Sequence, residues 1–248
     1  MVLHPETEGF ARSAGAYERG RPGYPDALVE WIVSLSGAGT GTDVVDLGAG
    51  TGKLTRRLFG TGAEVVAVEP VSTMRLTLEV LLPEVRTVEG TAESLPLPDC
   101  SADVVTVAQA FHWFANDQAL TEISRVLRPR GLLILVWNRR DPADPLQAGI
   151  AAIVDRHRDV TPSYGTGSWR KVMDETQLFV AEAEVHLPND QRTSRSGLRD
   201  RVASTSFVAR LPDGERTRLL DEVVGLLPDG EEKVVLRYTT DAYAYRVR

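Results

Sequence analysis

The chain has 248 residues, enough for one large α/β domain or one domain with an inserted cap. Its formal net charge of −7 gives no basic footprint for nucleic acid, so we expect no nucleic-acid partner. Cys100 is the single cysteine, which excludes a disulfide framework or a cysteine zinc site within one chain. The opening residues lack a basic, apolar signal sequence, and the longest apolar run, at 131–137, is too short to span a bilayer. We therefore expect a cytoplasmic protein with no membrane contact.

Residues 1–40 are predicted to form a lid and a first helix. In YERGRPGYP at 17–25, two prolines and two glycines prevent a continuous helix, which predicts a lid strand or loop. Apolar residues at helical spacing predict a helix over 25–36, with a stripe made of Leu28, Trp31, Ile32 and Leu35.

The stretch VVDLGAGTGKLT at 44–55 carries the strongest signal in the chain. It predicts a strand at 43–47, a turn containing Gly48, Gly50 and Gly52, and a helix at about 52–60. Glycine is required where the backbone takes a positive φ or comes close to a ligand. A helix that begins at such a turn presents free N–H groups to a ligand. The stretch therefore indicates a nucleotide-type loop, with an ordinary strand-to-helix turn as the alternative.

The spacing of the loop separates two kinds of nucleotide site. A phosphate-binding P-loop fails, because Leu47 stands where its first glycine is needed and Leu54 where Ser or Thr is needed. The dinucleotide fingerprint places its third glycine at position 53, where this chain has Lys53. Asp46 lies two residues before the first glycine, where a carboxylate suits a cationic ligand end better than a phosphate.

A second strand is predicted at 64–69, and it ends in Glu69. A carboxylate at this position is placed to accept hydrogen bonds from ribose hydroxyls, and a solvated strand-end glutamate is the alternative. The separation between Asp46 and Glu69 is also compatible with a dinucleotide fold, so spacing alone does not decide the cofactor.

The rest of the chain continues the alternation of strands and helices, which predicts a doubly wound α/β fold with a mostly parallel sheet. The further strands are predicted at 84–88, 102–108, 131–138, 180–187 and 234–247, and the further helices at 117–127, 145–158 and 215–227. Residues 189–233 form a longer segment than a simple connection between two strands needs. We interpret them as a helical cap, with a dimerisation surface as the alternative, so the protein is expected to be a monomer or a homodimer.

These motifs together resemble the class I S-adenosylmethionine-dependent methyltransferases. The resemblance is carried by the glycine loop, by Glu69-Pro70, by GTAESLPLPDCSADVV at 90–105, by AQAFHWF at 108–114 and by RVLRPRGLLILVWN at 125–138. FARSAGAYERGRPGYP at 10–25 is similar to a small-molecule branch that includes trans-aconitate methyltransferase-like proteins, of methyltransferase type 11. One departure is Arg130, where the family usually has a glycine.

The resemblance implies a Rossmann-like sheet of seven strands whose last strand is antiparallel. It assigns residues 41–188 to the methyltransferase core, 189–233 to the cap and 234–248 to the final strand of the sheet. It implies S-adenosyl-L-methionine as the cofactor, which leaves as S-adenosyl-L-homocysteine. The residues that it assigns to the cofactor are Asp46, Gly48, Gly50, Gly52, Glu69, Met74, Ala92, Glu93, Gln109, Tyr17 and Arg21. Met74 would cover a face of the adenine, Ala92 and Glu93 would lie near it, and Tyr17 and Arg21 would close over the methionine end.

Methyl transfer from a sulfonium is an in-line displacement with a good leaving group, so alignment and exclusion of water are the main tasks. No metal is expected. His112, at the end of the fourth predicted strand, is the candidate general base, with a hydrogen-bonding role in the pocket wall as the alternative. The residues predicted to line the acceptor pocket are Phe111, Trp113, Asn138 and Arg139.

The sequence therefore predicts an S-adenosylmethionine-dependent methyltransferase that acts on an oxygen, nitrogen or carboxylate acceptor of a small molecule. Two alternatives stay open. One is an NAD(P)-dependent oxidoreductase, which the displaced third glycine disfavours, and the other is a cofactor-binding protein without turnover.

Overall fold

The computed structural model describes residues 7–158 and 164–248, and their side chains from residue 14 onward. The chain divides into two compact units, which we name the core unit and the helical unit. The core unit comprises Tyr24–Trp137, Pro162–Leu187 and Thr240–Arg248. The helical unit comprises Met1–Gly23, Asn138–Thr161 and Pro188–Thr239.

A sheet of seven strands organises the fold, in the order β3-β2-β1-β4-β5-β9-β6. Its strands are β1 (Asp43–Leu47), β2 (Glu64–Val68), β3 (Arg86–Val88), β4 (Ala102–Ala108), β5 (Leu127–Arg140), β6 (Phe179–Pro188) and β9 (Tyr238–Val247). The pairings of β1 with β2 and β4, of β2 with β3 and of β4 with β5 are parallel. The last strand, β9, is antiparallel to its neighbours: Arg246 near its end contacts Arg130 near the start of β5. The predicted fold class is therefore confirmed.

The central strands form because β-branched apolar residues fill them and both of their faces are buried. In β1 the residues Val44, Val45 and Leu47 are each at most 3% exposed. Near-continuous apolar runs of this kind are typical of parallel strands covered by helices on both faces. Polar residues that persist within these strands, such as Asp46 and Thr106, are therefore candidates for a function.

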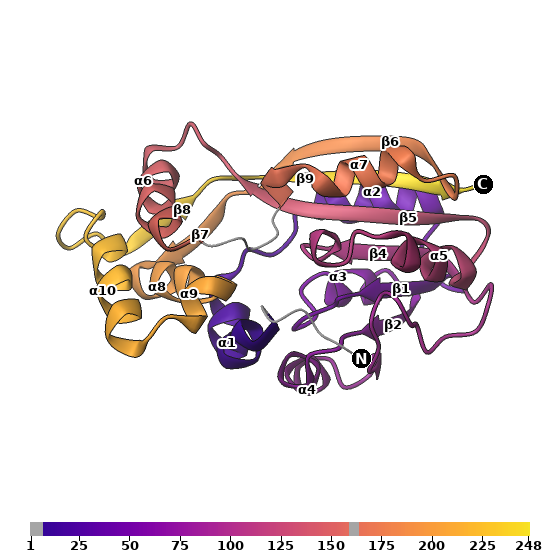
Figure 1. Ribbon diagram of the computed structural model, residues 1–248, viewed down its shortest axis with the longest axis horizontal. Coiled ribbons are helices and arrows are strands. Elements are labelled where there is room, and N and C mark those ends of the chain that lie inside the picture. Colours follow the sequence, from indigo (N-terminus) through magenta and orange to yellow (C-terminus); the bar gives the residue numbers. More distant parts are fainter. Residues whose placement is uncertain (1–6, 159–163) are drawn as a thin grey trace. The chain divides into compact units, whose positions relative to one another are not determined.

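Helices cover both faces of the sheet in the core unit. On one face pack α2 (Asp26–Ser36), α3 (Thr55–Phe59) and α4 (Ser72–Leu81). On the other pack α5 (Asp117–Val126) and α7 (Ser168–Glu175). Figure 1 shows α7 in front of the sheet and α2 behind it. A 3₁₀ turn, Phe111–Trp113, follows β4.

Two local predictions in the core unit differ from the structure. The helix predicted from residue 52 begins only at Thr55, because Gly50 and Gly52 have positive φ values of 60° and 85° and extend the turn. The fifth strand begins at Leu127 rather than at 131. Arg130, which replaces the family's usual glycine, lies within that strand with a φ of 68°, a conformation that glycine adopts at lower cost.

The helical unit has a hydrophobic core of its own. Its helices are α1 (Thr7–Gly20), α6 (Pro145–Val154), α8 (Arg195–Ala203), α9 (Ser206–Arg210) and α10 (Asp213–Val224), with a 3₁₀ turn at Asp155–His157. They bury a separate apolar cluster that includes Ile150, Leu198, Val202, Leu220 and Val223. Residues 189–233 are thus largely helical, and the segments 138–161 and 1–23 join them in one unit.

The unit boundaries differ from the predicted ones, because contacts between distant segments determine them. Residues 1–40 divide between Gly23 and Tyr24. Residues 17–20 of the predicted lid belong to α1, and the chain leaves the helix only before Pro22. The single strand predicted at 234–247 is two strands, because β8 (Lys233–Leu236) ends before Arg237 and pairs with β7 (Gln191–Ser194) in a separate small sheet.

Gly20 permits a close approach between α1 and α8. A Cβ atom at Gly20 would overlap backbone atoms of Asp200 and Arg201, including the Arg201 Cα at 2.7 Å. Arg19 adds a two-point ion pair with Asp200 at 2.7 and 3.1 Å. Because Gly20 has no side chain, the end of α1 can lie directly against the backbone of α8.

We predict that Gly20→Ala destabilises the helical unit by about 2 kcal/mol or more, because backbone atoms cannot move aside to admit a methyl group. Gly15→Ala in the same helix is the matched control. Its Cβ would meet the flexible end of Arg19 at 3.3 Å, and alanine is favoured over glycine in a helix by up to about 1 kcal/mol. Denaturant unfolding of the two variants measures both effects. Equal stability of the two variants would contradict the close approach.

Candidate functional site

The candidate site lies at the carboxyl ends of β1, β2 and β4, where the strand order reverses between β1 and β4. Ligands of open α/β sheets bind at such a switch point. The register aligns Asp46 with Ala67 on one side and with Thr106 on the other. The loops that follow these aligned strands therefore bring together the regions of Gly48, Glu69 and Gln109.

The glycine loop adopts a conformation that side chains would hinder. Gly48, Gly50 and Gly52 have φ values of 69°, 60° and 85°, all in the left-handed region. A Cβ at Gly48 would also lie 2.8 Å from the Ala110 Cβ, and one at Gly52 would lie 3.0 Å from the Leu78 Cγ. The loop after β1 therefore packs closely against the loop after β4 and against α4.

Asp46 is a buried carboxyl group that braces the loop. Its Oδ2 accepts a hydrogen bond from the Thr55 hydroxyl at 2.6 Å, and its Oδ1 accepts one from the Thr106 hydroxyl at 2.9 Å. Burial raises its pKa to about 6. The side chain is 1% exposed, so it braces the loop in this structure, and its contact with the cofactor stays a prediction. Its charge still disfavours a phosphate near the loop.

Glu69 joins the glycine loop to the end of the second strand. Its Oε2 accepts from the Gly50 backbone N–H and its Oε1 accepts from the Val71 backbone N–H, each at 2.8 Å. Arg75 donates to the Glu69 carbonyl oxygen, also at 2.8 Å. Burial raises the pKa of Glu69 to about 7, against the opposing effect of the two backbone donors. Each carboxylate oxygen retains a second lone pair, so the group can still accept from ligand hydroxyls.

Gln109 follows the last residue of β4 and has a strained conformation. Its φ is 59°, in the left-handed region that is uncommon for residues other than glycine. Its backbone N–H still donates to the Val136 carbonyl at 2.8 Å, so the strand pairing continues up to this residue. Strain of this kind at a strand end facing the switch point is typical of functional sites.

His112 has a fixed partner in the core unit. The Trp137 indole N–H donates to the His112 Nδ1 at 3.2 Å. An indole nitrogen can only donate, so Nδ1 acts as the acceptor and the neutral imidazole carries its proton on Nε2. In this arrangement Nε2 presents a donor, which does not suit the general-base role and fits the alternative hydrogen-bonding role.

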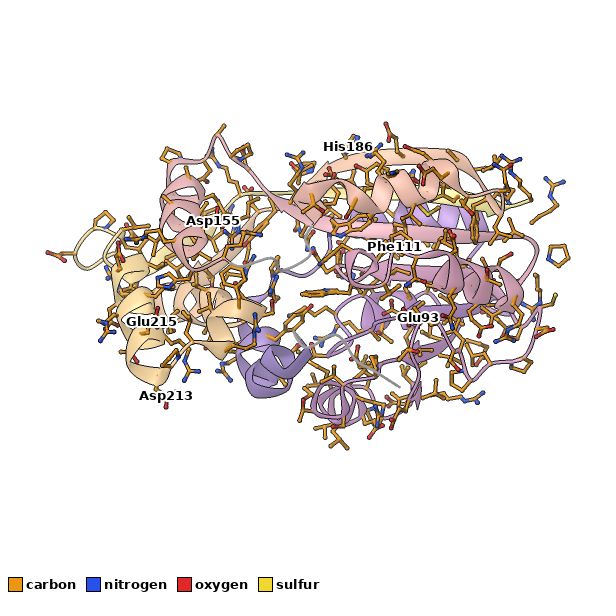
Figure 2. The ribbon with its side chains drawn as sticks, in the orientation of Figure 1. Glu93, Phe111, Asp155, His186, Asp213 and Glu215 are labelled. Atoms are coloured by element: carbon orange, nitrogen blue, oxygen red, sulfur yellow. The ribbon has the colours of Figure 1, made fainter. Side chains whose placement is uncertain are left out.

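Burial separates the other predicted core-unit residues into two groups. Phe111, labelled in Figure 2, is fully buried and meets the Phe114 ring edge-on, and its place in the acceptor pocket stays a prediction. Met74 and Ala92 are also buried, at 2% and 3% exposure. Their roles near the adenine stay predictions. Two others are partly exposed: Trp113, whose ring contacts His112, and Glu93, whose Oε1 accepts from Asn116 at 3.1 Å.

Four predicted site residues belong to the helical unit. Arg21 lies over the Tyr17 ring and donates to the Ser204 hydroxyl at 3.0 Å. Asn138 donates to the Gly23 carbonyl and accepts from Asn189, each at 3.0 Å, and Arg139 is exposed. Their proposed contacts with cofactor or acceptor stay predictions.

Comparisons with known proteins agree with this geometry. The family model of the methyltransferase domain matches residues 45–135, which contain the glycine loop, Glu69 and His112. An uncharacterized methyltransferase of Mycobacterium tuberculosis is 40% identical over 218 residues, which cover 88% of this chain and 85% of the relative. An uncharacterized methyltransferase-like protein of Schizosaccharomyces pombe is 33% identical over 250 residues, covering 98% of this chain and 97% of the relative. This chain belongs to the methyltransferase family.

Solved structures similar to this methyltransferase support the fold alone. A candidate type II methyltransferase from Anaeromyxobacter dehalogenans has a TM-score of 0.65 and 24% identity, over 91% of this chain and 97% of that one. The [4+2]-cyclase SpnF has a TM-score of 0.55 and 16% identity, over 92% of this chain and 84% of that one. The same fold thus hosts another reaction, and the trans-aconitate branch of the family stays a prediction.

Three functional partners in this methyltransferase were not found from the sequence. Thr55 and Thr106 hold Asp46, and Trp137 orients His112. Thr106 could have been noticed in the sequence, because it is a polar residue within the apolar strand VVTVA. Trp137 could not, because its pattern is that of the last apolar residue of a buried strand. Among the described residues, no helix is long and apolar enough to cross a membrane, and no group of three or more His, Cys, Asp or Glu could hold a metal.

We predict that Asp46→Asn flattens the pH dependence of stability between about pH 4 and pH 6. Burial raises the pKa of Asp46 from 3.8 to about 6, so the folded protein binds this proton more tightly than the unfolded chain does. The resulting stability is fully present below the unfolded pKa and is lost as the pH rises through the folded pKa, a loss of roughly 3 kcal/mol. The threonine hydroxyls can both donate to and accept from an asparagine amide.

Denaturant unfolding of the wild type and of this variant across the pH range measures the difference. Parallel curves for the two proteins would show that Asp46 keeps an ordinary pKa in the folded state.

Proposed function

We propose that this protein is an S-adenosylmethionine-dependent methyltransferase that acts on a small-molecule acceptor. The observation that carries the proposal is the Glu69 carboxylate, which holds the glycine loop through Gly50 N–H and keeps lone pairs for ligand hydroxyls. Family membership supports methyl transfer in general. A ubiquinone/menaquinone biosynthesis C-methyltransferase of Hahella chejuensis is 36% identical over 127 residues, covering 47% of this chain and 50% of the relative.

The residues present fit this cofactor better than a dinucleotide. Gly48 packs closely against Ala110, and the carboxylate that holds the glycine loop, Glu69, suits a ribose with two hydroxyls. Asp46 and Glu69 place two buried carboxyl groups at the loop, which favour a cationic ligand and disfavour a pyrophosphate. Glu69 would hold the ribose, while Ala92 and Glu93 would lie near the adenine.

When bound, S-adenosylmethionine supplies an activated methyl group on a sulfonium. The chain's own task is then to orient the acceptor and to exclude water. The strained Gln109 backbone and the partly exposed Trp113 ring are proposed to shape the space beyond β4. The proposed acceptor is an oxygen, nitrogen or carboxylate atom of a small molecule.

His112 is proposed to orient the acceptor as a hydrogen-bond donor rather than to remove a proton. The Trp137 hydrogen bond occupies Nδ1, so the neutral ring carries its proton on Nε2. A donor at this position suits an acceptor that carries a carbonyl or carboxylate oxygen.

We predict that S-adenosylhomocysteine binds the wild-type protein and that Glu69→Gln weakens binding by about 10- to 100-fold, because a hydrogen bond to a charged group contributes about 1.5–3 kcal/mol. Burial raises the pKa of Glu69 to about 7, so wild-type affinity should fall as the pH drops below 7, and the variant should lack this dependence. Isothermal titration calorimetry measures both effects.

Glu64→Gln is the matched control, since Glu64 is an exposed carboxylate at the other end of the same strand. If S-adenosylhomocysteine did not bind at high micromolar concentration, the proposal would be contradicted. Stabilisation by NAD in a thermal melt would instead favour the oxidoreductase. Tight S-adenosylhomocysteine binding without methyl transfer to a broad acceptor panel would favour a binding protein.

We predict that neutral His112 carries its proton on Nε2. Nitrogen-15 NMR of the histidine side chains measures the tautomer directly and needs no acceptor, and His112→Asn assigns the signal among the four histidines of the chain. A neutral Nδ1–H form would be incompatible with the Trp137 hydrogen bond and would restore the general-base role.

A further inference from the structure

Three arginines from distant parts of the chain meet in the helical unit. Arg21 follows α1, Arg140 ends β5 and Arg201 lies in α8. Burial together with the charge of Arg201 lowers the pKa of both Arg21 and Arg140 to about 10. Arg140 also lowers the pKa of Arg21. The three positive charges are therefore close enough to repel one another.

The hydrogen bonds of this cluster leave a buried donor unused. Arg21 donates from Nε to the Ser204 hydroxyl at 3.0 Å and from Nη2 to the Ser204 carbonyl at 2.9 Å. Arg201 donates from Nε to the Tyr238 hydroxyl at 2.8 Å, yet its Nη1 is buried without a hydrogen-bond partner. Arg201 is only 6% exposed, so this unused donor is a costly feature for the folded protein.

Other polar atoms around the cluster are also unsatisfied. Gln191 donates to the carbonyl of Gly20, next to Arg21, while its Oε1 is buried without a partner. Thr205 follows Ser204, and its Oγ1 is likewise buried without a partner. Buried groups of this kind are rare in folded proteins and need an explanation such as a bound ligand or ion.

The acidic side chains near these arginines in the sequence pair with other arginines. Asp200 binds Arg19 at 2.7 Å, and Asp155 binds Arg158 at 2.9 Å. Asp144 lies 4.0 Å from Arg237. Asp155 still raises the pKa of Arg140 and so offsets part of the positive charge of the cluster, and Asp141, next to Arg140, accepts from the Ala143 backbone N–H at 2.9 Å.

Tyr238 shows how strong the local positive charge is. Its side chain is buried, which by itself raises the pKa of a phenol, but Arg201 and Arg140 lower it below its ordinary value. Positive charges that lower the pKa of a buried phenol would also favour a bound oxyanion. Guanidinium groups also match the planar geometry of carboxylates and phosphates through paired N–H donors.

We infer that Arg140 and Arg201, with Arg21 beside them, form an oxyanion-binding site for a small molecule that carries a carboxylate or phosphate group. The site lies wholly within the helical unit and goes beyond the proposed function. Arg139, which the sequence predicts to line the acceptor pocket, is exposed, whereas the adjacent Arg140 joins the cluster.

Calorimetry and thermal unfolding of the full chain test this site, with inorganic phosphate and succinate as separate probes at an ionic strength held constant with NaCl. We expect saturable binding and stabilisation of the wild type by at least one probe, and the tighter probe identifies the source of the oxyanion. Arg140→Gln and Arg201→Gln should weaken binding at least tenfold. Ligand-free Arg140→Gln should melt a few degrees above the wild type, because one repelling charge is removed.

Arg237→Gln is the matched control, since Arg237 is an exposed arginine next to Tyr238, and it should bind the probe as the wild type does. Arg140→Lys keeps the charge and guards against a folding defect, and its affinity should fall several-fold because an ammonium lacks the paired donors. Equal affinity of this variant and the wild type would overturn the role of Arg140. The proposed site would be overturned if neither phosphate nor succinate stabilised the wild type more than NaCl does at the same ionic strength.

Titration of the same variants with S-adenosylhomocysteine separates this site from the cofactor site. Arg140→Gln should bind S-adenosylhomocysteine as the wild type does, whether or not the proposed function holds. Loss of both ligands in this variant would show that the cluster binds the carboxylate of the cofactor instead, and would overturn a separate oxyanion site.

Discussion

The candidate site depends on one buried carboxylate, that of Glu69. Its two oxygens accept from the backbone of Gly50 in the loop after β1 and of Val71 in the segment before α4. These two hydrogen bonds fix the glycine loop relative to the end of the second strand. A loop with three positive φ values has few side-chain contacts of its own, so it needs such an external acceptor to adopt a single conformation.

Asp46 provides the second fixed point of the loop, from the opposite side. It binds a hydroxyl on each flanking element, Thr55 in α3 and Thr106 in β4, and it is almost fully buried. Asp46 and Glu69 are both buried beside the glycine loop. This burial raises the pKa of both carboxyl groups and lowers the free energy of unfolding near neutral pH. Proteins retain such costs mainly where a ligand uses the charge, which agrees with a cationic cofactor.

In both units of the protein, charged side chains that lower stability lie at a proposed ligand site. In the core unit the buried groups are acidic, and they lie beside the glycine loop. In the helical unit they are the arginines Arg21, Arg140 and Arg201, with an unused donor on the last. Each cluster is destabilising without a partner of opposite charge. The sign of the charge therefore indicates the class of ligand for each, a cation for the first and an oxyanion for the second.

The sequence by itself determined the features that depend on local spacing. Glycine positions and alternating apolar segments predicted the loop, the order of strands and helices, and the methyltransferase family, because backbone sterics and periodic burial act between near neighbours. Only the tertiary structure decided which side chains face the core, as with Phe111, and which arginine of the pair 139–140 is the less exposed. It also decided the proton position on His112, through Trp137, and the assembly of the helical unit from three segments. These features depend on contacts between residues far apart in the chain, and such contacts leave no periodic signal in the sequence.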